Sequence, residues 1–367
     1  MRPRRLLPPL LRSFLPPLSL ALVLAACGAR ADLDAPAIEE SARCIDQGDW
    51  TMTTPMHAPR WLPELVAIER DGALAIGGRS EGALTATIER FDAGEESWTP
   101  IGSLAEPRQF HTATLLADGR VLVAGGYTAA ADGSGAGISR AEIVDPDSGV
   151  VQSTAPMPAG RYVHGAARLP SGRVLVTGGF SSGVVDDVAF LFDPSAESWE
   201  TVPAPPGVAT GYVGVAPSSR GAWVVTYEGV VAFDEATRSF ALVPHPLPEG
   251  ADALNGPVAT AIDGGGFAVV DVAGFLGVGD ASGDVTWTRL WTTGGAQPTP
   301  VILGVAQLCA AIVVATDRGA RRVDLETGVA SDLEPSLGLG VLARLTDGTL
   351  LSIGGTDSTR AAATVFR

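Results

Sequence analysis

The sequence predicts an all-β fold assembled from repeated units of four short strands. Three observations predict it: 45 Gly and 27 Pro among 367 residues, a double glycine that recurs after short apolar runs, and an aspartate turn that recurs downstream. This composition suits many short strands joined by tight turns. A chain with only 18% charged residues is not expected to form long amphipathic helices.

The first element along the chain is an export signal. Four arginines within the first 12 residues precede an apolar run from Leu18 to Ala26, which is too short to span a bilayer as a helix. The run ends in Leu24-Ala25-Ala26-Cys27-Gly28, which resembles the lipobox of bacterial lipoproteins. The resemblance implies cleavage before Cys27, a lipid on its thiol, and a folded part outside the cytoplasm. The alternative is an ordinary secretory signal with a chance cysteine near its cleavage site.

This resemblance also sets the domain boundaries. Residues 1–26 are expected to be the lipoprotein signal peptide, residues 27–46 the lipidated cysteine and a flexible tether, and residues 47–367 the folded domain. Gly28 is not the Asp that commonly signals retention in the inner membrane, so the outer membrane is favoured. Two or more acyl chains anchor a protein stably, and we expect the membrane to be a partner only through this lipid anchor.

The charge of the chain excludes one class of partner. Without the four signal arginines the chain keeps 21 basic and 41 acidic residues, a net charge of −20, and every basic residue is Arg. Phosphate backbones require a basic face, so nucleic acid is not expected as a partner.

The repeated units follow the tether. Double glycines end apolar runs at residues 73–76, 121–124, 174–177 and 350–353. The first two intervals are 48 and 53 residues, and the remaining 176 residues divide into four steps of 44. Three degenerate units lie where this division predicts them, at residues 223–229, 267–274 and 312–319. Seven units are therefore implied.

Each unit contains the pattern of four strands. Residues 108–120 and 161–173 show a strand followed by a glycine turn that leads into the strand before the double glycine. Downstream lie a third strand, an Asp turn, and a fourth strand that opens on a large apolar residue such as Trp98 or Trp199. Four short strands in about 44–53 residues are typical of a propeller blade, so the sequence predicts a seven-bladed β-propeller.

These residues resemble the kelch family, whose double glycine closes the second strand and whose Trp lies on the outer strand. The resemblance extends from about Gly48 to the end of the chain. It is strong in the first three units, whereas units four to six lose the double glycine and depend on spacing. The fold predicted is therefore a kelch-type propeller.

The two chain ends are predicted to share the last blade. The final unit ends at Arg367 after a third strand at residues 361–366, and no fourth strand follows. Residues 44–52 match the missing fourth strand and place Trp50 where Trp98 stands in its own unit. An open last blade would expose sheet edges, so this N-terminal strand is expected to complete it.

Two cysteines remain once Cys27 is lipidated. Cys44 is expected just before the outer strand of blade seven, and Cys309 in the turn between the first two strands of blade six. Both turns lie on one face of a propeller, in neighbouring blades. A disulfide between Cys44 and Cys309 and a pair of unpaired thiols are both consistent with the sequence.

A repeated Arg-x-x-His pattern supplies the binding-face candidates. Arg60, Arg108 and Arg161 precede the first strands of blades one to three, and His111 and His164 follow the last two of them. One interpretation places these side chains at the channel mouth as an anion or carbohydrate site. The other makes them part of the repeat, with bonds to loop carbonyls in each blade, and it is favoured because packing residues recur whereas sites are asymmetric.

No metal or cofactor is expected. The histidines of successive blades lie too far apart for zinc, and Asp145, Asp186, Asp187 and Asp193 are expected to cap turns. Residues 128–137 form an insertion in blade two that departs from its neighbours. Its single carboxylate falls short of a calcium site, so a mobile rim loop is expected.

The kelch resemblance also suggests enzymes. Galactose-oxidase-like copper enzymes need Tyr and His ligands and a Cys cross-linked to a Tyr, and no such set is visible among four Tyr and three Cys. Residues 280–287 resemble a sialidase Asp box only superficially, and neither a His-Glu-x-x-His nor a Gly-Lys-Ser/Thr motif occurs in the sequence.

The leading functional hypothesis is a non-catalytic binding module outside the cytoplasm. Its partner would be an envelope protein, a peptide or a glycan, bound by the loops between strands two and three and between blades. The alternative is a carbohydrate-active propeller enzyme, a hydrolase or an oxidase, with its site at the central channel. A structural spacer is a third hypothesis, and we expect the protein to be a monomer.

Overall fold

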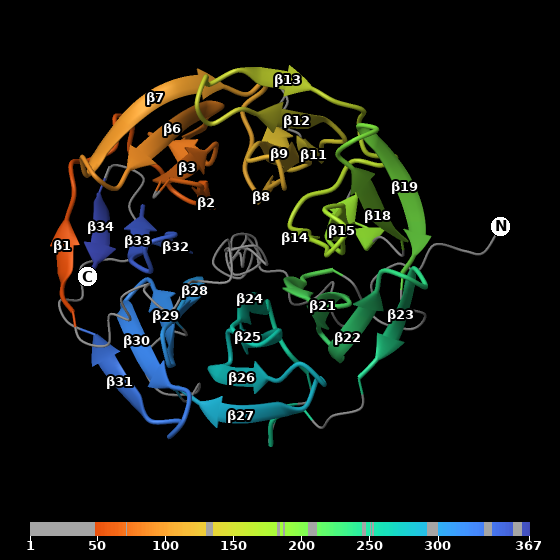
Figure 1. Cartoon of the computed structure of the whole chain (residues 1–367), viewed down its shortest axis with the longest axis vertical. Helices are drawn as coiled ribbons and strands as arrows, with labels where there is room; N and C mark the ends of the chain where they lie inside the picture. The colour runs from red at the N-terminus through yellow and green to blue at the C-terminus, as the bar shows by residue number, and fades with distance from the viewer. Residues whose placement is uncertain are drawn as a thin grey trace.

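The computed structural model describes residues 48–70, 72–129, 135–181, 184–185, 188–204, 211–243, 247–249, 251, 253–291, 300–333, 340–354 and 362–367. Within these residues, seven four-stranded antiparallel sheets form a closed ring of blades (Figure 1). The first strand of each blade lies nearest the ring axis and the fourth lies at the periphery. The chain is thus a seven-bladed β-propeller, as its sequence predicts.

Each blade is numbered by its order along the chain, and its strands are given from the axis outward. Blades one to three are β2 (Glu64–Ile68), β3 (Gly72–Ile76), β6 (Thr87–Asp92) and β7 (Ser97–Ser103); β8 (Thr112–Leu115), β9 (Val121–Ala124), β12 (Ala141–Val144) and β13 (Val151–Ser153); and β14 (Gly165–Arg168), β15 (Val174–Thr177), β18 (Val188–Asp193) and β19 (Ser198–Pro203). Blades four to six are β20 (Gly214–Ser218), β21 (Gly221–Thr226), β22 (Gly229–Asp234) and β23 (Ser239–Leu242); β24 (Val258–Ile262), β25 (Gly266–Val270), β26 (Phe275–Gly279) and β27 (Val285–Arg289); and β28 (Ile302–Leu308), β29 (Ala311–Thr316), β30 (Gly319–Asp324) and β31 (Ala330–Leu333). Blade seven is β32 (Val341–Arg344), β33 (Leu350–Ile353), β34 (Ala363–Phe366) and β1 (Trp50–Met52).

The core lies between neighbouring blades. The second strands are short runs of Val, Leu, Ile and Ala, and strand β9 is buried along its whole length. One apolar cluster joins Ile68 and Leu74 of blade one to Leu115 and Val123 of blade two. Because each blade buries its faces against two neighbours, inter-blade packing is the main source of stability.

The N-terminal strand closes the ring. Strand β1 pairs antiparallel with β34 in the register Trp50↔Phe366, and the two rings meet edge to face with centroids 5.3 Å apart. The Thr53 amide donates a further hydrogen bond of 3.0 Å to the Ala363 carbonyl. This confirms the predicted closure, which covers the edge that β34 would otherwise expose.

Blades four to six are complete despite the loss of the double glycine. In blade four the tight turn between β21 and β22 is held by Thr226, whose Oγ1 donates to the Gly229 carbonyl at 3.0 Å and accepts from the Glu228 amide at 3.3 Å. Blade six repeats this turn with Thr316 and Gly319 at 2.9 Å. The side-chain hydroxyl thus replaces the glycine pair as the device that reverses the chain.

The turns between the third and fourth strands use aspartate, as predicted. Asp145 Oδ1 accepts from the amides of Asp147 and Ser148, both at 2.9 Å, and Asp193 Oδ1 accepts from Ser195 and Ala196 at 2.9 and 3.2 Å. These carboxylates stabilise turns. Asp186 and Asp187 lie outside the described residues.

Short hairpins extend from the turns between the second and third strands of the first three blades. They are β4 (Arg79–Ser80) with β5 (Ala83–Leu84), β10 (Tyr127–Ala129) with β11 (Gly135–Gly137), and β16 (Phe180–Ser181) with β17 (Val184–Val185). All three blades carry a hairpin here, and the connection of blade two is the longest, with 16 residues between β9 and β12 against 10 in blades one and three, as the predicted insertion requires. Its residues 130–134 lie outside the described residues.

Cys309 lies in the turn between β28 and β29, as expected, and it is disulfide-bonded. Its partner lies outside the described residues, so the pairing with Cys44 stays a prediction. In the parts of the chain that the structure describes, no helix is long and apolar enough to cross a membrane.

Candidate functional site

The three repeated arginines lie inside the wall of the ring. Arg60, Arg108 and Arg161 are each 0% exposed, and His111 and His164 are each 1% exposed. The expectation that these five side chains present a binding face at the channel mouth is therefore corrected: a ligand in solvent does not reach them in this structure. The surface directly above them is formed by other residues.

The arginines tie each double glycine to its own blade. The Nη1 atoms of Arg60, Arg108 and Arg161 donate to the carbonyls of Gly77, Gly125 and Gly178 at 3.1, 3.2 and 3.1 Å. Each hydrogen bond spans 17 residues and joins the entry of the first strand to the end of the second. Buried guanidinium groups need such acceptors, and the loop carbonyls supply them.

The same residues tie each blade to the next one. The amides of Gly78 and Gly126 donate to the carbonyls of Arg108 and Arg161 in the following blade, both at 2.9 Å. Gly126 has a φ of 106°, and a Cβ there would lie 2.8 Å from the Cβ of His111. Glycine is required because both the conformation and the space exclude a side chain.

The two histidines fill the space at these joints. A Cβ on Gly77 or Gly125 would lie 2.8 Å from the Cε1 atom of His111 or His164, respectively. The Nε2 atom of His164 also lies 3.1 Å from Thr112 Oγ1 in the preceding blade. The Arg-x-x-His pattern is thus a structural part of the repeat.

One position opposite the arginines differs between blades. Arg60 pairs with Glu89 at 2.9 Å and Arg108 with Glu142 at 2.6 Å, and both carboxylates lie in the third strand of the blade. Burial lowers the pKa of Arg60, and the hydrogen bond and charge of Glu89 oppose this shift. In blade three the same position is Phe190, and the Arg161 guanidinium lies 4.0 Å from the centre of its ring.

Above this network lies a row of half-buried rings, which we name the aromatic arc. It consists of Trp61, Tyr127, Tyr162, Phe180 and Tyr212, packed on one apolar cluster. Four of these rings contact one another in turn, with centroids 5.6 Å apart for Tyr127–Tyr162, 6.0 Å for Tyr162–Phe180 and 5.0 Å for Phe180–Tyr212, and Trp61 packs on the same cluster. The first and the last of these pairs meet edge to face, an arrangement in which aromatic rings attract one another.

The fold builds the arc by a repeated arrangement. The residue after each arginine pairs with the residue after each double glycine, in the bridges Trp61↔Arg79, Gln109↔Tyr127 and Tyr162↔Phe180. In blades two and three the ring on the hairpin then contacts the next blade, so that Tyr127 meets Tyr162 and Phe180 meets Tyr212. The arc therefore spans blades one to four.

Strained backbone supports the arc from below. Leu62, Phe110 and Val163 occupy the same position in blades one to three, with φ values of 51°, 58° and 58°. Their side chains are buried in the cluster under the arc, together with Leu303 from blade six. A left-handed conformation is unusual for a β-branched residue such as Val163, and residues of this kind concentrate at functional sites.

The arc offers polar groups as well as rings. Burial raises the pKa of Tyr162 and of Tyr212, and a neighbouring tyrosine adds to each shift, so both phenols stay protonated at neutral pH. Gln109 is 4% exposed, and its Oε1 atom has no hydrogen-bond partner among the described residues. Protonated phenols can hydrogen-bond a polar ligand that also packs on the rings, whereas the Gln109 oxygen is buried beneath them.

Sequence reasoning missed the arc because its members differ in every blade. The position after the arginine is Trp61, Gln109 or Tyr162, and the position after the double glycine is Arg79, Tyr127 or Phe180. The available signal was the excess of aromatic residues at these two positions.

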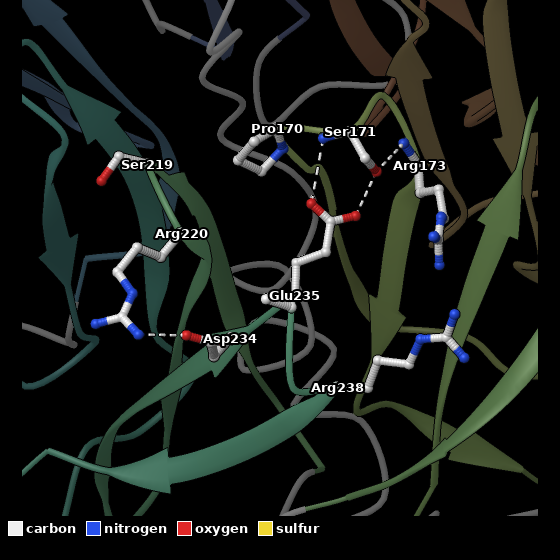
Figure 2. Close-up of a pocket in the computed structure, with 9 residues that line it drawn as sticks. Pro170, Ser171, Arg173, Ser219, Arg220, Asp234, Glu235 and Arg238 are labelled. Carbon is white, nitrogen blue, oxygen red and sulfur yellow. Dashed lines mark hydrogen bonds and ion pairs between the residues drawn. The ribbon is translucent and has the colours of Figure 1, made fainter.

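A second candidate surface lies on the face of the propeller opposite to the aromatic arc. Figure 2 shows a groove of ≈ 500 Å³ between blades three and four, lined among others by Ser171, Arg173, Arg220, Glu235 and Arg238. The Glu235 carboxylate accepts from Ser171, with the backbone amide at 3.2 Å and the hydroxyl as second donor. Asp234 pairs with Arg220 at 2.6 Å on the other side of the groove.

Metal-ligating groups do not gather in the described part of the chain. No three His, Cys, Asp or Glu side chains there are placed to hold a metal ion. Because Cys309 is disulfide-bonded, its thiol is not available for a cross-link to a tyrosine.

No family model and no curated protein sequence match the chain. Among solved structures, it is similar to a novel fungal alcohol oxidase with catalytic diversity among the AA5 family, in complex with copper. The two share 15% identity and a TM-score of 0.64, over 87% of this chain and 76% of that one. The chain is also similar to YjhT, with 15% identity and a TM-score of 0.55, over 86% of this chain and 96% of that one. At 15% identity, the similarity to these two structures shows a shared fold and nothing further.

Proposed function

We propose that the protein is a non-catalytic binding module whose ligand, a protein or a glycan, packs on the aromatic arc. The observation that carries the proposal is asymmetry. The buried arginines recur in each of the first three blades, as packing residues do, whereas the rings above them differ from blade to blade. Surfaces that recognise a ligand differ between repeats of a shared scaffold.

The physical character of the arc supports this proposal. Its rings are half-buried and held by one another, so a ligand meets a pre-ordered surface and little side-chain entropy is lost on binding. The protonated phenols of Tyr162 and Tyr212 add hydrogen-bonding groups to the rings. Aromatic anchors beside a few polar groups are the usual composition of a recognition surface.

The proposal also includes the repeat family of the module and its attachment to a membrane. We infer a kelch-type propeller, because the Arg-x-x-His pattern and the double glycine join successive blades by the same contacts. We also infer a lipid anchor at Cys27 that presents the propeller outside the cytoplasm, favouring the outer membrane. The motif at residues 24–28 and the apolar run before it support this inference.

The experiment is ligand capture by the purified chain from residue 28 onward, from envelope and glycan extracts. The variants Tyr162→Ala and Phe180→Ala remove two rings of the arc, and their folding is checked by circular dichroism. Tyr227→Ala is the matched control, because Tyr227 is 43% exposed and makes none of the arc's ring contacts. We expect a saturable ligand that both arc variants lose and the control retains; equal capture by all variants would refute the arc as the site.

A second candidate function is an enzyme acting on carbohydrate. The likeness to the fungal alcohol oxidase favours it, although at 15% identity that likeness extends to the fold alone. The described residues do not fit a copper centre of the kind that the family resemblance suggests, since His111 and His164 are buried in the wall and Cys309 is disulfide-bonded. The test is hydrogen peroxide release and bond hydrolysis with the captured ligand as substrate. Turnover lost in Tyr162→Ala would favour the enzyme over the binding module.

A further inference from the structure

The groove of Figure 2 lies between blades three and four, and it can be compared with the equivalent boundary between blades two and three. At the boundary between blades two and three, the turn before β9 carries Arg120, which pairs with Asp118 at 2.8 Å and lies 3.8 Å from Glu197. At the boundary between blades three and four, the equivalent turn carries Arg173. The blades on either side of the two boundaries have the same strand order, so the side chains at equivalent positions can be compared directly.

Both acidic partners of the arginine are replaced at the second boundary. Ser171 occupies the position of Asp118, two residues before the arginine. Arg238 occupies the position of Glu197, four residues after the turn aspartate, and the two residues share a positive φ of 53° and 47°. Arg173 therefore faces a second cation where Arg120 faces two carboxylates, while the turn aspartate is kept: the charge of Arg173 helps to lower the pKa of Asp193, as that of Arg120 does for Asp145.

Figure 2 shows the Arg173 and Arg238 guanidinium groups pointing toward one another in the groove. Within the described residues, the Arg173 guanidinium makes no hydrogen bond or ion pair, and Arg238 pairs with Glu200 through Nη1. Two like charges at one place repel unless an anion lies between them.

The carboxylates that line the groove are already engaged. Both oxygens of Glu235 accept from Ser171, and Asp234 Oδ2 accepts from Arg220 while its Oδ1 accepts from the Thr237 amide at 3.0 Å. The unused hydrogen-bonding capacity of the groove therefore consists of guanidinium N–H donors. A ligand that satisfies it must be rich in acceptors.

We propose that Arg173 and Arg238 bind an oxyanion group of a small ligand, a carboxylate, sulfate or phosphate, in this groove. Guanidinium groups bind such oxyanions through paired N–H donors in one plane. The volume of ≈ 500 Å³ leaves room for the sugar or ester that carries the oxyanion. The groove and the aromatic arc lie on opposite faces of the propeller, so this site is independent of the proposed function.

The test is isothermal titration of the chain from residue 28 onward with inorganic phosphate, sulfate and glucuronate in separate arms. We expect saturable binding of at least one probe, and the arm that binds most tightly identifies the oxyanion. Arg173→Gln should weaken that binding at least tenfold. Ser171→Asp should do the same without removing a cation, because it restores beside Arg173 the carboxylate that Asp118 provides beside Arg120.

Arg120→Gln is the matched control, since it removes an arginine from the equivalent turn one blade away. It should leave the affinity within a factor of two. Absence of saturable binding in all three arms would overturn the proposal. So would equal weakening by Arg120→Gln and Arg173→Gln, which would show that overall charge alone determines binding.

Discussion

The guanidinium group of Arg161 lies 4.0 Å from the centre of the Phe190 ring, at the position where Arg60 meets Glu89 and Arg108 meets Glu142. The same buried arginine is therefore retained opposite an acidic or an aromatic neighbour. Its constant partners are backbone carbonyls at the double glycine. The arginine holds the entry of the first strand to the end of the second strand. This structural role explains why it recurs in three blades, although the aromatic arc next to it differs from blade to blade.

Breaking a buried pair at this joint should destabilise the whole ring. Glu142→Ala leaves the Arg108 guanidinium, which is 0% exposed, without the carboxylate that binds it at 2.6 Å and with Glu106 at 3.6 Å, and it leaves the Ala105 amide without an acceptor. We expect a loss of about 3–5 kcal/mol in the free energy of unfolding, measured by urea denaturation. Arg220→Ala removes an ion pair from an exposed side chain and should change it by about 0–1 kcal/mol. Comparable losses in both variants would contradict this account of the joint.

The second glycine of the pair should not tolerate a side chain. Gly126→Ala places a Cβ 2.8 Å from His111 Cβ and 2.9 Å from the Gln109 carbonyl oxygen, whereas Gly82→Ala meets no atom within 4 Å. Both glycines have positive φ, so the difference between the variants isolates the steric contact of Gly126 with Gln109 and His111 in the same blade. We expect Gly126→Ala to lose about 1–3 kcal/mol more than Gly82→Ala in thermal or urea unfolding. Equal losses would show that conformation alone requires glycine there.

Ring closure should be cooperative. Trp50 is 5% exposed and packs on Phe366, so Trp50→Ala should lower the free energy of unfolding by about 3–5 kcal/mol. Met52→Ala, in the same strand but 62% exposed, should change it by less than about 0.5 kcal/mol. Hydrogen exchange should then accelerate in every blade of the Trp50 variant. Acceleration confined to blade seven would contradict a ring that opens as one unit.

Stability should fall in acid because of the aspartate turns. Hydrogen bonds from the turns hold the pKa of Asp145, Asp193, Asp234 and Asp324 below its usual value. A lowered pKa in the folded state contributes stability above the unfolded-state value of about 3.9, and that contribution is lost as pH falls through the folded-state pKa. Urea midpoints measured from pH 6 to pH 2 should decline below about pH 4. Asp193→Asn should flatten that decline, and an unchanged slope would remove this turn from the explanation.

The fold could be predicted from sequence because its determinants are local and repeated. The apolar runs that end in double glycines became β9 and β15 with the predicted bounds, and the match of residues 44–52 to an outer strand predicted β1. Blades four to six followed from spacing more than from motif. Their turns use the hydroxyls of Thr226 and Thr316 in blades four and six and the carboxylate of Asp271 in blade five instead of two glycines, so the motif disappears while the strand length persists.

The candidate site was less predictable because its contacts join distant residues. The acidic partner of Arg108 is Glu142, 34 positions downstream in the third strand, and no local pattern shows that the arginine is buried. Tyr127 and Tyr162 meet only because the hairpin of one blade reaches the entry of the next. The sequence therefore left the arginines as both repeat residues and binding-face candidates, and it did not predict the cluster of rings next to them.

If the aromatic arc receives the ligand, its tyrosines become shielded from solvent when the ligand binds. Hydroxyl-radical footprinting of the four tyrosines, with and without the captured ligand, measures this shielding. We expect protection of Tyr127, Tyr162 and Tyr212, which belong to the arc, and unchanged labelling of Tyr227, which is 43% exposed outside it. Unchanged labelling of the three arc tyrosines at a saturating ligand concentration would contradict the arc as the binding site.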